Sequence, residues 1–400
     1  MKILYFGTVC DLAEYEKMLS NCSSKPSIAP IVFETSLLSG FKKNNAEVEV
    51  YSFPMIPTFP SFKKLWWGSK REKLSCGYKT TWLKTINIPI IKQFSRKIDA
   101  KRILKKFLKS NKGQDCAVLT YSIPPFLAKS VVKYCNKYNV KCYAVVTDLL
   151  RDMYMNAQDS SIVTKLKNFY LNNAIKYQGC YDGYIYLTEA MKDVINPEKP
   201  YIVVEGIADI SNVQPPSITE KNHPKVIMYA GMLHENYGVL NLLEAFRKFE
   251  NNDVELWLFG DGNCVDKINE YCEKDSRIKF FGRVERDKIL NTERQASLLV
   301  NIRNTDDDYT KYSFPSKTIE YMLSGTPVLT SKLSGIPDEY FNYVYTVESN
   351  RVDDILKALQ EIFNKSDKDN CEVGFRAQKF IVENKNSVVQ ASNILKFMKN

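Results

Sequence analysis

One stretch decides the fold: Tyr312-Ser-Phe-Pro-Ser-Lys-Thr-Ile-Glu-Tyr-Met-Leu-Ser-Gly-Thr-Pro-Val-Leu329. Pro315 stands where a helix is expected to begin, because proline is favoured at the first helical position. Gly325 stands where that helix is expected to end, and Pro327 and an apolar run follow it. The order of loop, short helix and strand is typical of α/β proteins.

The rest of the chain repeats this alternation of short apolar runs and helical patterns. Helices are expected over Ile31–Lys42, Leu127–Lys137 and Gly238–Phe249. Buried strands are expected in the first half at Lys2–Phe6, Val48–Phe53, Ala117–Thr120, Tyr143–Thr147, Tyr184–Leu187 and Tyr201–Glu205. In the second half they are expected at Val226–Tyr229, Glu255–Phe259, Lys279–Phe281, Leu298–Asn301 and Val328–Thr330. The pattern predicts doubly wound parallel sheets.

The alternation pauses between Asp209 and Pro224, where Pro215-Pro216 and polar residues indicate a linker. We therefore expect two Rossmann-like domains, over residues 1–210 and 211–380, facing each other across a cleft. Residues 381–400 are expected to form a C-terminal helix that packs back toward the first domain. In open α/β sheets ligands bind beyond the carboxyl ends of the strands, so the loops there should line the cleft.

The helix after Pro315 carries groups suited to a nucleoside diphosphate. Lys317 and Glu320 fall on one face of it. Backbone N–H groups at a helix start attract anions, Lys317 adds a positive charge, and the Glu320 carboxylate can accept hydrogen bonds from two sugar hydroxyls. The alternative is a capped helix with a Lys–Glu surface pair.

Further segments occur in an order that resembles a known family. They are Glu205-Gly-Ile-Ala-Asp209, Ile227-Met-Tyr-Ala-Gly231 with the loop to Gly238, Leu258-Phe-Gly-Asp-Gly262, Phe280-Phe-Gly282 and Phe314-Pro-Ser-Lys-x-x-Glu320. Together they resemble the GT-B retaining glycosyltransferases of glycosyltransferase family 4, over essentially the whole chain. The resemblance is strongest to members that build bacterial capsule, exopolysaccharide or O-antigen units.

The resemblance implies a donor site in the second domain. Glu320 matches the second glutamate of the family's Glu-x7-Glu motif and is expected to bind the nucleotide ribose. The backbone amides of the loop before the helix should face the sugar and diphosphate. This loop comprises Ser313, Phe314, Pro315 and Ser316, of which Pro315 has no N–H. Gly231 should allow close approach of its loop to the diphosphate, or it is an ordinary turn glycine.

Three departures from the family pattern affect this site. Tyr312 stands where the first glutamate of the motif would be, and Met232 and Tyr237 replace the usual arginine and lysine. The diphosphate would then need other cations. Lys317, Arg303 and His234 are the candidates, although Arg303 is equally consistent with a surface residue at a strand end.

The first domain is expected to hold the acceptor. Asp148 ends a buried strand and could orient or deprotonate the acceptor hydroxyl, or it caps the next helix. The resemblance also implies that the leaving diphosphate helps to take the proton, so that Asp148 need only bind. Gly7, Ser27 and Ala29 lie in loops that face the cleft in the family, and Glu189 is a weaker candidate.

Positive charge is concentrated between Ser61 and Lys112, where 16 Lys/Arg face two acids, a net +14 that leaves −4 for the rest of the +10 chain. Aromatic residues and an apolar stripe, Ile91, Phe94, Ile98, Leu104, Phe107 and Leu108, lie in this basic stretch. Basic helices with such faces bind anionic membrane interfaces. The alternatives are a solvated helix face and, without a recognised motif, a nucleic-acid surface.

Composition predicts the compartment and excludes other classes. The chain starts without the apolar run of a signal peptide, and its ten cysteines are scattered, so we expect reduced thiols in the cytosol. No dinucleotide or Walker-type glycine motif is present. A metal-dependent alternative would use Asp306-Asp-Asp308 to hold Mn²⁺.

We therefore expect a metal-independent, retaining glycosyltransferase without a cofactor. It would use a nucleotide sugar, with UDP as the expected carrier, and a saccharide or lipid-linked saccharide acceptor in surface polysaccharide synthesis. We expect it at the inner face of the plasma membrane, bound through residues 61–112, and not on nucleic acid. The alternative from another class is a non-catalytic partner subunit with a degenerate donor site.

Overall fold

The chain divides into two compact α/β units. The structure is a computed structural model that describes residues 1–400 except 21, 23–25, 151–161, 212, 216–223 and 306–307. Unit 1 comprises residues 1–207 and 387–400, and unit 2 comprises residues 208–386. Each unit has its own sheet and its own buried apolar core, so each is described by itself.

Unit 1 is built on an eight-stranded sheet in the order β10-β9-β8-β7-β1-β2-β5-β4. All neighbours are parallel except the edge pair β4–β5. The strands are β1 (Lys2–Gly7), β2 (Glu47–Ser52), β4 (Arg71–Lys73), β5 (Lys79–Trp82), β7 (Cys116–Tyr121), β8 (Lys141–Val146), β9 (Gly183–Tyr186) and β10 (Tyr201–Val203). The central strands are apolar because parallel strands are buried on both faces.

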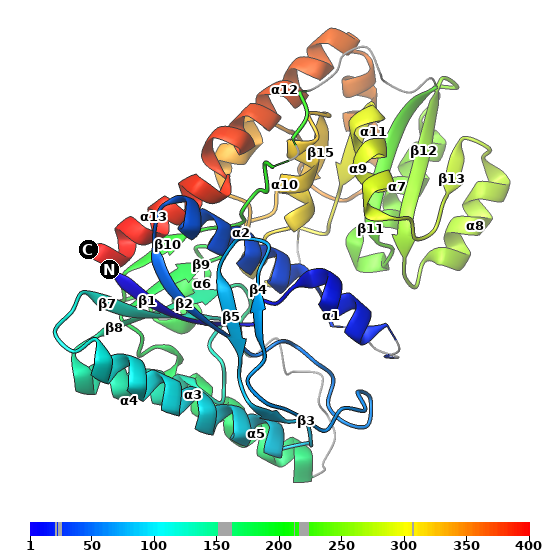
Figure 1. Ribbon diagram of the computed structural model, residues 1–400. Coiled ribbons are helices and arrows are strands. Elements are labelled where there is room, and N and C mark those ends of the chain that lie inside the picture. Colours follow the sequence, from blue (N-terminus) through cyan, green and yellow to red (C-terminus); the bar gives the residue numbers. More distant parts are fainter. Residues whose placement is uncertain (21, 23–25, 151–161, 212, 216–223, 306–307) are drawn as a thin grey trace. The chain divides into compact units, whose positions relative to one another are not determined.

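The helices of unit 1 connect these strands and cover the sheet (Figure 1). They are α1 (Leu12–Leu19), α2 (Ala29–Lys43), α3 (Ile91–Ser110), α4 (Ala128–Tyr138), α5 (Ile162–Gln178), α6 (Met191–Ile195) and the C-terminal α13 (Ser387–Lys399). The last helix packs on α2, and its Ile394 and Met398 belong to the same buried cluster as Ile3 and Leu37. The end of the chain therefore completes the core of the first unit.

Unit 2 is built on a six-stranded, all-parallel sheet in the order β13-β12-β11-β14-β15-β16. Its strands are β11 (Lys225–Met232), β12 (Val254–Asp261), β13 (Ile278–Phe280), β14 (Leu298–Asn301), β15 (Val328–Ser331) and β16 (Tyr345–Val347). Its helices are α7 (Val239–Lys248), α8 (Val265–Lys274), α9 (Arg286–Gln295), α10 (Ser316–Leu323), α11 (Val352–Phe363) and α12 (Asp367–Asn384). Short 3₁₀ turns are η1 (Glu235–Tyr237), η2 (Asp308–Tyr312) and η3 (Asp338–Asn342).

The predicted fold class is confirmed: both units are parallel α/β folds, and every strand expected from the sequence is present within a few residues. The basic stretch differs from the prediction. Its first part forms β4 and β5 and a separate two-stranded antiparallel sheet of β3 (Trp66–Trp67) and β6 (Thr85–Ile86). No helix in the part of the chain that the structure describes is long and apolar enough to cross a bilayer.

The apolar stripe of α3 also differs from the prediction, because it divides between two faces. Leu104, Phe107 and Leu108 are buried, while Ile91, Phe94 and Ile98 are 42%, 54% and 56% exposed. The apolar residues of the second half of α3 therefore lie on its buried side, and those of the first half face outward.

The contact between α13 and α2 depends on Gly40. A Cβ atom there would lie 1.9 Å from the Ser387 carbonyl oxygen and 2.6 Å from the Ala391 methyl group. We predict that Gly40→Ala destabilises unit 1 by about 1–3 kcal/mol through overpacking. Gly68→Ala is the control, since its Cβ would meet nothing nearer than 3.4 Å. Urea unfolding, monitored by amide hydrogen exchange in peptides of unit 1, measures the stability of both variants. Equal stability of the two variants would contradict this packing.

Candidate functional site

The helix α10, which the sequence singled out, is fixed in unit 2 from several sides. Asn301 at the end of β14 donates to the Thr318 hydroxyl at 3.3 Å, and Gln378 of α12 donates to the Leu323 carbonyl at 2.8 Å. Pro315 was predicted at the first helical position and lies one position before it, since the helix begins at Ser316. No side chain among the described residues caps the first N–H groups of α10. The Thr318 N–H donates to the Pro315 carbonyl at 2.8 Å. The N–H groups of Ser316 and Lys317, at the very start of the helix, therefore remain available to an anion.

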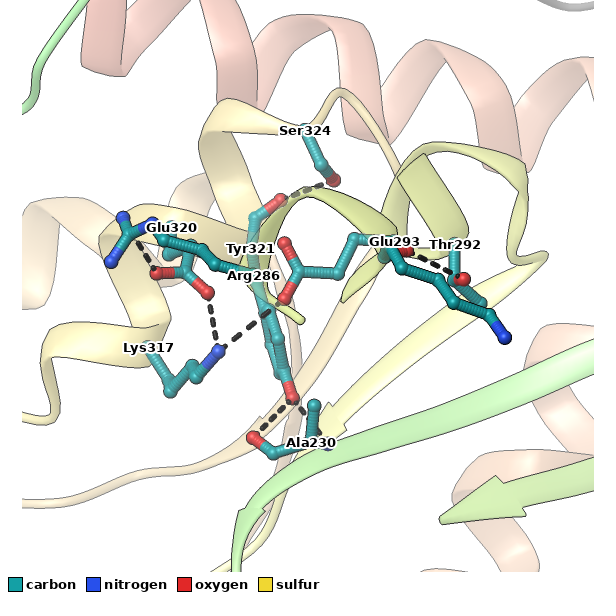
Figure 2. A network of polar contacts seen from close by, with 9 residues as sticks. Ala230, Arg286, Thr292, Glu293, Lys317, Glu320, Tyr321 and Ser324 are labelled. Carbon is teal, nitrogen blue, oxygen red and sulfur yellow. Dashed lines mark hydrogen bonds and ion pairs between the residues drawn. The ribbon is translucent and has the colours of Figure 1, made fainter. Parts of the chain in front are cut away.

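Tyr321 connects α10 to the central strand β11. Its buried hydroxyl accepts a hydrogen bond from the Ala230 N–H at 2.9 Å and donates to the Ala230 carbonyl at 3.1 Å (Figure 2). β11 pairs with β14 at Ile227 and Met228, so the Tyr321 hydroxyl bonds to backbone groups of β11 that lie beyond this pairing. The side chain thereby sets the position of α10 against the carboxyl end of β11.

A charged cluster lies on α10 beside Tyr321. The Lys317 ammonium lies between two carboxyl groups, bonding to Glu320 on its own helix and approaching Glu293 of α9 at 3.4 Å (Figure 2). Arg286 reaches the other oxygen of Glu320 at 3.6 Å. Lys317 also lies over the Tyr321 ring, 5.6 Å from its centroid. The two residues predicted to hold the nucleotide are thus in direct contact.

The two carboxyl groups of this cluster have different environments. Glu293 is fully buried, and its Oε2 has no hydrogen-bond partner among the described residues. Burial, and next the charge of Glu320, raise the pKa of Glu293 to about 8. Burial alone would raise the pKa of Glu320, but the charges of Lys317 and Arg286 lower it below its ordinary value. At neutral pH the Glu320 carboxyl group is therefore ionised, and the Glu293 carboxyl group is mostly protonated.

The loop before α10 is held by contacts within unit 2. The Phe314 ring is buried against Tyr340, with 5.4 Å between centroids, so its side chain belongs to the core. Gly335 lies so close that a Cβ there would meet the carbonyl oxygens of Thr310 and Ser313, each at 2.4 Å. Ser316 is exposed at the helix start. These contacts fix the loop whose backbone, over residues 313 to 316, is predicted to face the donor.

The glycines after β11 and β12 differ in what they require. A Cβ at Gly231 would make only ordinary contacts, the nearest at 3.6 Å from the Tyr229 hydroxyl. A Cβ at Gly260, where φ is +134°, would lie 1.8 Å from the Gly231 carbonyl oxygen, and one at Gly262 would lie 2.3 Å from the Leu233 carbonyl oxygen. The close packing of these two strand ends therefore depends on Gly260 and Gly262.

Tyr237 brings two predicted donor residues together. The Arg303 guanidinium lies 4.7 Å from the centre of its ring, and the His234 ring meets it edge-on at 6.3 Å. Arg303 follows β14, and His234 follows β11, two neighbouring strands of the sheet. Tyr237, which replaces the family's usual lysine, thus supports a pair of basic side chains beyond the carboxyl ends of the strands.

In unit 1 a buried carboxyl group lies beside the predicted residue Gly7. Glu34 of α2 is fully buried and accepts bonds from the Tyr5 hydroxyl at 2.7 Å, the Thr8 N–H at 2.8 Å and the Thr8 hydroxyl. A Cβ at Gly7 would lie 1.8 Å from Glu34 Oε2, so only glycine permits this approach. Burial raises the pKa of Glu34 to about 7, against the hydrogen bonds from Thr8 and Tyr5.

The other predicted residues of unit 1 are more exposed. The Thr147 hydroxyl bonds to Asp148 at 3.0 Å and to the Tyr121 hydroxyl at 3.2 Å, beyond the carboxyl end of β8. Ser27 accepts from the Ala29 N–H at 3.2 Å, at the start of α2. The alternative helix-cap role of Asp148 involves residues 151–161, and the metal-site alternative involves residues 306 and 307. Both segments lie outside the described residues.

Glu189, the weaker acceptor-side candidate, is held in a pair with Lys192 at 2.8 Å and also bonds to the Tyr201 hydroxyl at 3.0 Å.

Sequence reasoning missed Glu293, Glu34 and Tyr321. A signal for Glu293 was present, since it falls four residues after Ile289 and three after Leu290, on the inward side of α9. A charged residue at an inward position indicates a buried charge that needs a partner. No pattern in the sequence identifies that partner as Lys317.

The C-terminal part of the chain matches a known family. Residues 211–396 match the family described as "Glycosyl transferases group 1". This segment is therefore similar to a glycosyltransferase group 1 domain. It contains α10, Glu293 and all the predicted donor residues. No curated protein sequence matches the chain.

Solved structures with the same two-domain GT-B fold resemble the whole chain. Sucrose-phosphate synthase from Thermosynechococcus elongatus has a TM-score of 0.64 at 14% identity, over 100% of this chain and 98% of that one. The lipopolysaccharide outer core galactosyltransferase WaaB has 0.59 at 15%, over 100% and 99%. Anabaena HepE in complex with UDP and glucose has 0.59 at 14%, over 100% of both chains. At these identities the likeness shows the fold.

The bond between Tyr321 and β11 yields a prediction for stability. Tyr321→Phe leaves the N–H and carbonyl of Ala230 without this partner, which should cost about 1–3 kcal/mol of unfolding free energy. Tyr345→Phe is the control, because that hydroxyl donates to the half-buried Asn370 side chain, at 2.8 Å, and not to a buried strand. Urea unfolding measures both variants. A Tyr321→Phe protein as stable as the wild type would show that this hydroxyl does not hold α10.

Proposed function

We propose that the protein is a retaining glycosyltransferase that moves a sugar from UDP to a hydroxyl group of a saccharide or lipid-linked saccharide. The observation that carries the proposal is the ionised Glu320 beside Lys317 on α10, next to the uncapped start of that helix, within the group 1 domain. A carboxylate can accept hydrogen bonds from both ribose hydroxyls, and the N–H groups at the helix start can bind the diphosphate.

The choice of UDP rests on fold relatives. HepE is solved with UDP and with UDP-glucose, and a trehalose-6-phosphate structure from E. coli contains UDP-2-fluoro glucose. A saccharide acceptor and a role in surface polysaccharide synthesis agree with WaaB, named for the lipopolysaccharide outer core, and with TarM, solved with α-GlcNAc-glycerol. We extend these properties to this chain as part of the proposal.

The residues of this chain suggest how the reaction would proceed without a metal. Lys317 and Arg303 supply positive charge, and His234 an imidazole group, near the carboxyl ends of β11 and β14, where a diphosphate leaving group would develop charge. Asp148, exposed and bonded to Thr147, would orient the acceptor hydroxyl in unit 1. The leaving diphosphate would help to take the proton from this hydroxyl, which is consistent with retention.

The donor proposal is tested with a panel of nucleotide sugars. UDP-glucose at a hundredfold excess over its Kd should stabilise the wild type by about 2.7 kcal/mol, and EDTA should not change this or turnover. Glu320→Ala should lose at least tenfold in affinity, whereas the exposed control Glu348→Ala should bind like the wild type. If no donor stabilises the protein, or Glu320→Ala binds equally well, the site is wrong. Binding without transfer would favour the non-catalytic partner subunit.

We also propose that unit 1 binds the inner face of the plasma membrane through the basic stretch. One outward face of α3 carries Ile91, Phe94 and Ile98 in its first half. The same face continues as a hollow of about 510 Å³ lined by Ile98, Lys101, Arg102, Lys105, Lys106 and Lys109. The face is therefore apolar at one end and basic at the other, as expected of a helix that lies in an anionic interface.

Neighbouring elements extend the apolar end. Trp66, 61% exposed, pairs with Ile86 in the two-stranded sheet of β3 and β6, and the Ile86 N–H donates to the Ser95 hydroxyl of α3 at 3.0 Å. Among the described residues, nine of the fifteen exposed large apolar side chains lie between Phe59 and Ile98. Such a concentration marks an interaction surface. Trp67, Tyr78 and Trp82 are buried, so they contribute to folding and not to this surface.

Vesicle binding tests the membrane proposal. Replacing Lys101, Arg102, Lys105 and Lys106 with Gln should weaken binding to phosphatidylglycerol-containing vesicles by about a hundredfold or more, at roughly 1 kcal/mol per charge. Replacing Trp66, Phe94 and Ile98 with Ser should remove the apolar part of the binding, which is the part that persists at high salt. The control replaces Lys248, Lys357, Lys368 and Lys379 of unit 2 with Gln. Unchanged binding of the first two variants would contradict the proposal.

A further inference from the structure

Glu293 is a buried carboxyl group whose role the proposed reaction leaves unexplained. It is fully buried, whereas the side chains of its neighbours Lys317 and Glu320 are 30% and 24% exposed. Its Oε1 approaches the Lys317 ammonium at 3.4 Å, and its Oε2 has no hydrogen-bond partner among the described residues. Burying an ionised carboxylate with an unpaired oxygen costs free energy. The neutral, protonated form of Glu293 is therefore favoured unless a nearby positive charge compensates.

The charges around Glu293 decide its state. The titratable and charged groups that face it come from α10 and are Lys317, Glu320 and Tyr321. Lys317 is bonded to Glu320, and the Tyr321 hydroxyl is engaged with Ala230. Arg286, on the same helix as Glu293, is 64% exposed and reaches only Glu320, at 3.6 Å. The Lys317 ammonium is thus shared by Glu320 and Glu293, and the fully buried Glu293 is the one that keeps its proton.

The backbone of Glu293 is fixed by a contact of its own. The Thr326 hydroxyl, in the loop after α10, donates to the Glu293 carbonyl at 2.7 Å. Thr326 is fully buried, so α9 and the end of α10 are joined at this point. This contact fixes the backbone from which the Glu293 carboxyl group reaches Lys317, so a change in the charge of that carboxyl would act on Lys317.

We propose that Glu293 is a positioning residue of the donor site, whose uncharged carboxyl keeps Lys317 beside Glu320 and available to the nucleotide diphosphate. This inference rests on the proposed function of the Glu320 site. When Glu293 loses its proton, its carboxylate competes with the diphosphate for Lys317 and adds a negative charge next to an anionic ligand. Nucleotide binding and the proton on Glu293 then favour each other.

The direction of the pH effect follows from this coupling. Burial and the charge of Glu320 raise the pKa of Glu293 to about 8, so the neutral form predominates at pH 7 and the anion at pH 9. Donor affinity should fall as the pH rises through this range. By linkage, a bound nucleotide sugar raises the pKa of Glu293 further, so binding near pH 8 takes up protons from solution.

The experiment measures the Kd of UDP-glucose between pH 7.0 and 9.0 for the wild type and for Glu293→Gln. Gln imitates the neutral acid, so the ratio of the two Kd values cancels titration of the nucleotide itself. We expect this ratio, wild type over variant, to rise on the order of tenfold from pH 7.0 to 9.0. Glu361→Gln, on the exposed face of α11, is the control and should follow the wild type.

A second measurement uses only the wild type, in case Glu293→Gln folds poorly. Titration calorimetry at pH 8.0 in buffers of different ionisation enthalpy should show proton uptake of up to about half a proton per UDP-glucose bound, decreasing toward pH 6.5. Binding with a constant Kd ratio and without proton uptake overturns the role of Glu293 and leaves the donor site intact. Absence of UDP-glucose binding at every pH overturns the donor site, and this inference with it.

Discussion

The interaction on which the donor site depends is the sharing of one ammonium group by two carboxyl groups. Lys317 contacts Glu320 on its own helix and Glu293 on α9, and it lies over the ring of Tyr321, which is itself bonded to β11. This contact joins two helices and a central strand. It also separates the two acids chemically, because Glu320 keeps its charge while Glu293 keeps its proton.

The same arrangement explains why α10 can be both short and precise. A helix of eight residues contributes little stability of its own, so its position comes from tertiary contacts. Asn301, Gln378 and Tyr321 supply these from β14, α12 and the helix itself. Its first N–H groups are left uncapped, as an anion-binding helix start requires. In unit 1, Glu34 has a comparable place beyond β1, where Gly7 admits its carboxyl group.

The sequence predicted the fold well because apolar runs and helix signals are local. The strand at Leu298–Asn301 and the helix after Pro315 were predicted almost to the residue. The short strands of the basic stretch were not, because Arg71–Lys73 forms a polar edge strand without an apolar run. The pairing of Lys317 with Glu320 could be expected from their spacing of three. The pairing with Glu293 could not, since it joins residues 24 positions apart through tertiary packing.

The most direct test of the account is a crystal structure of the protein with UDP bound. The account predicts ribose hydroxyls within hydrogen-bond distance of the Glu320 carboxylate and a diphosphate oxygen at the start of α10, close to Lys317. UDP bound elsewhere, or a ribose held without contact to Glu320, would contradict it.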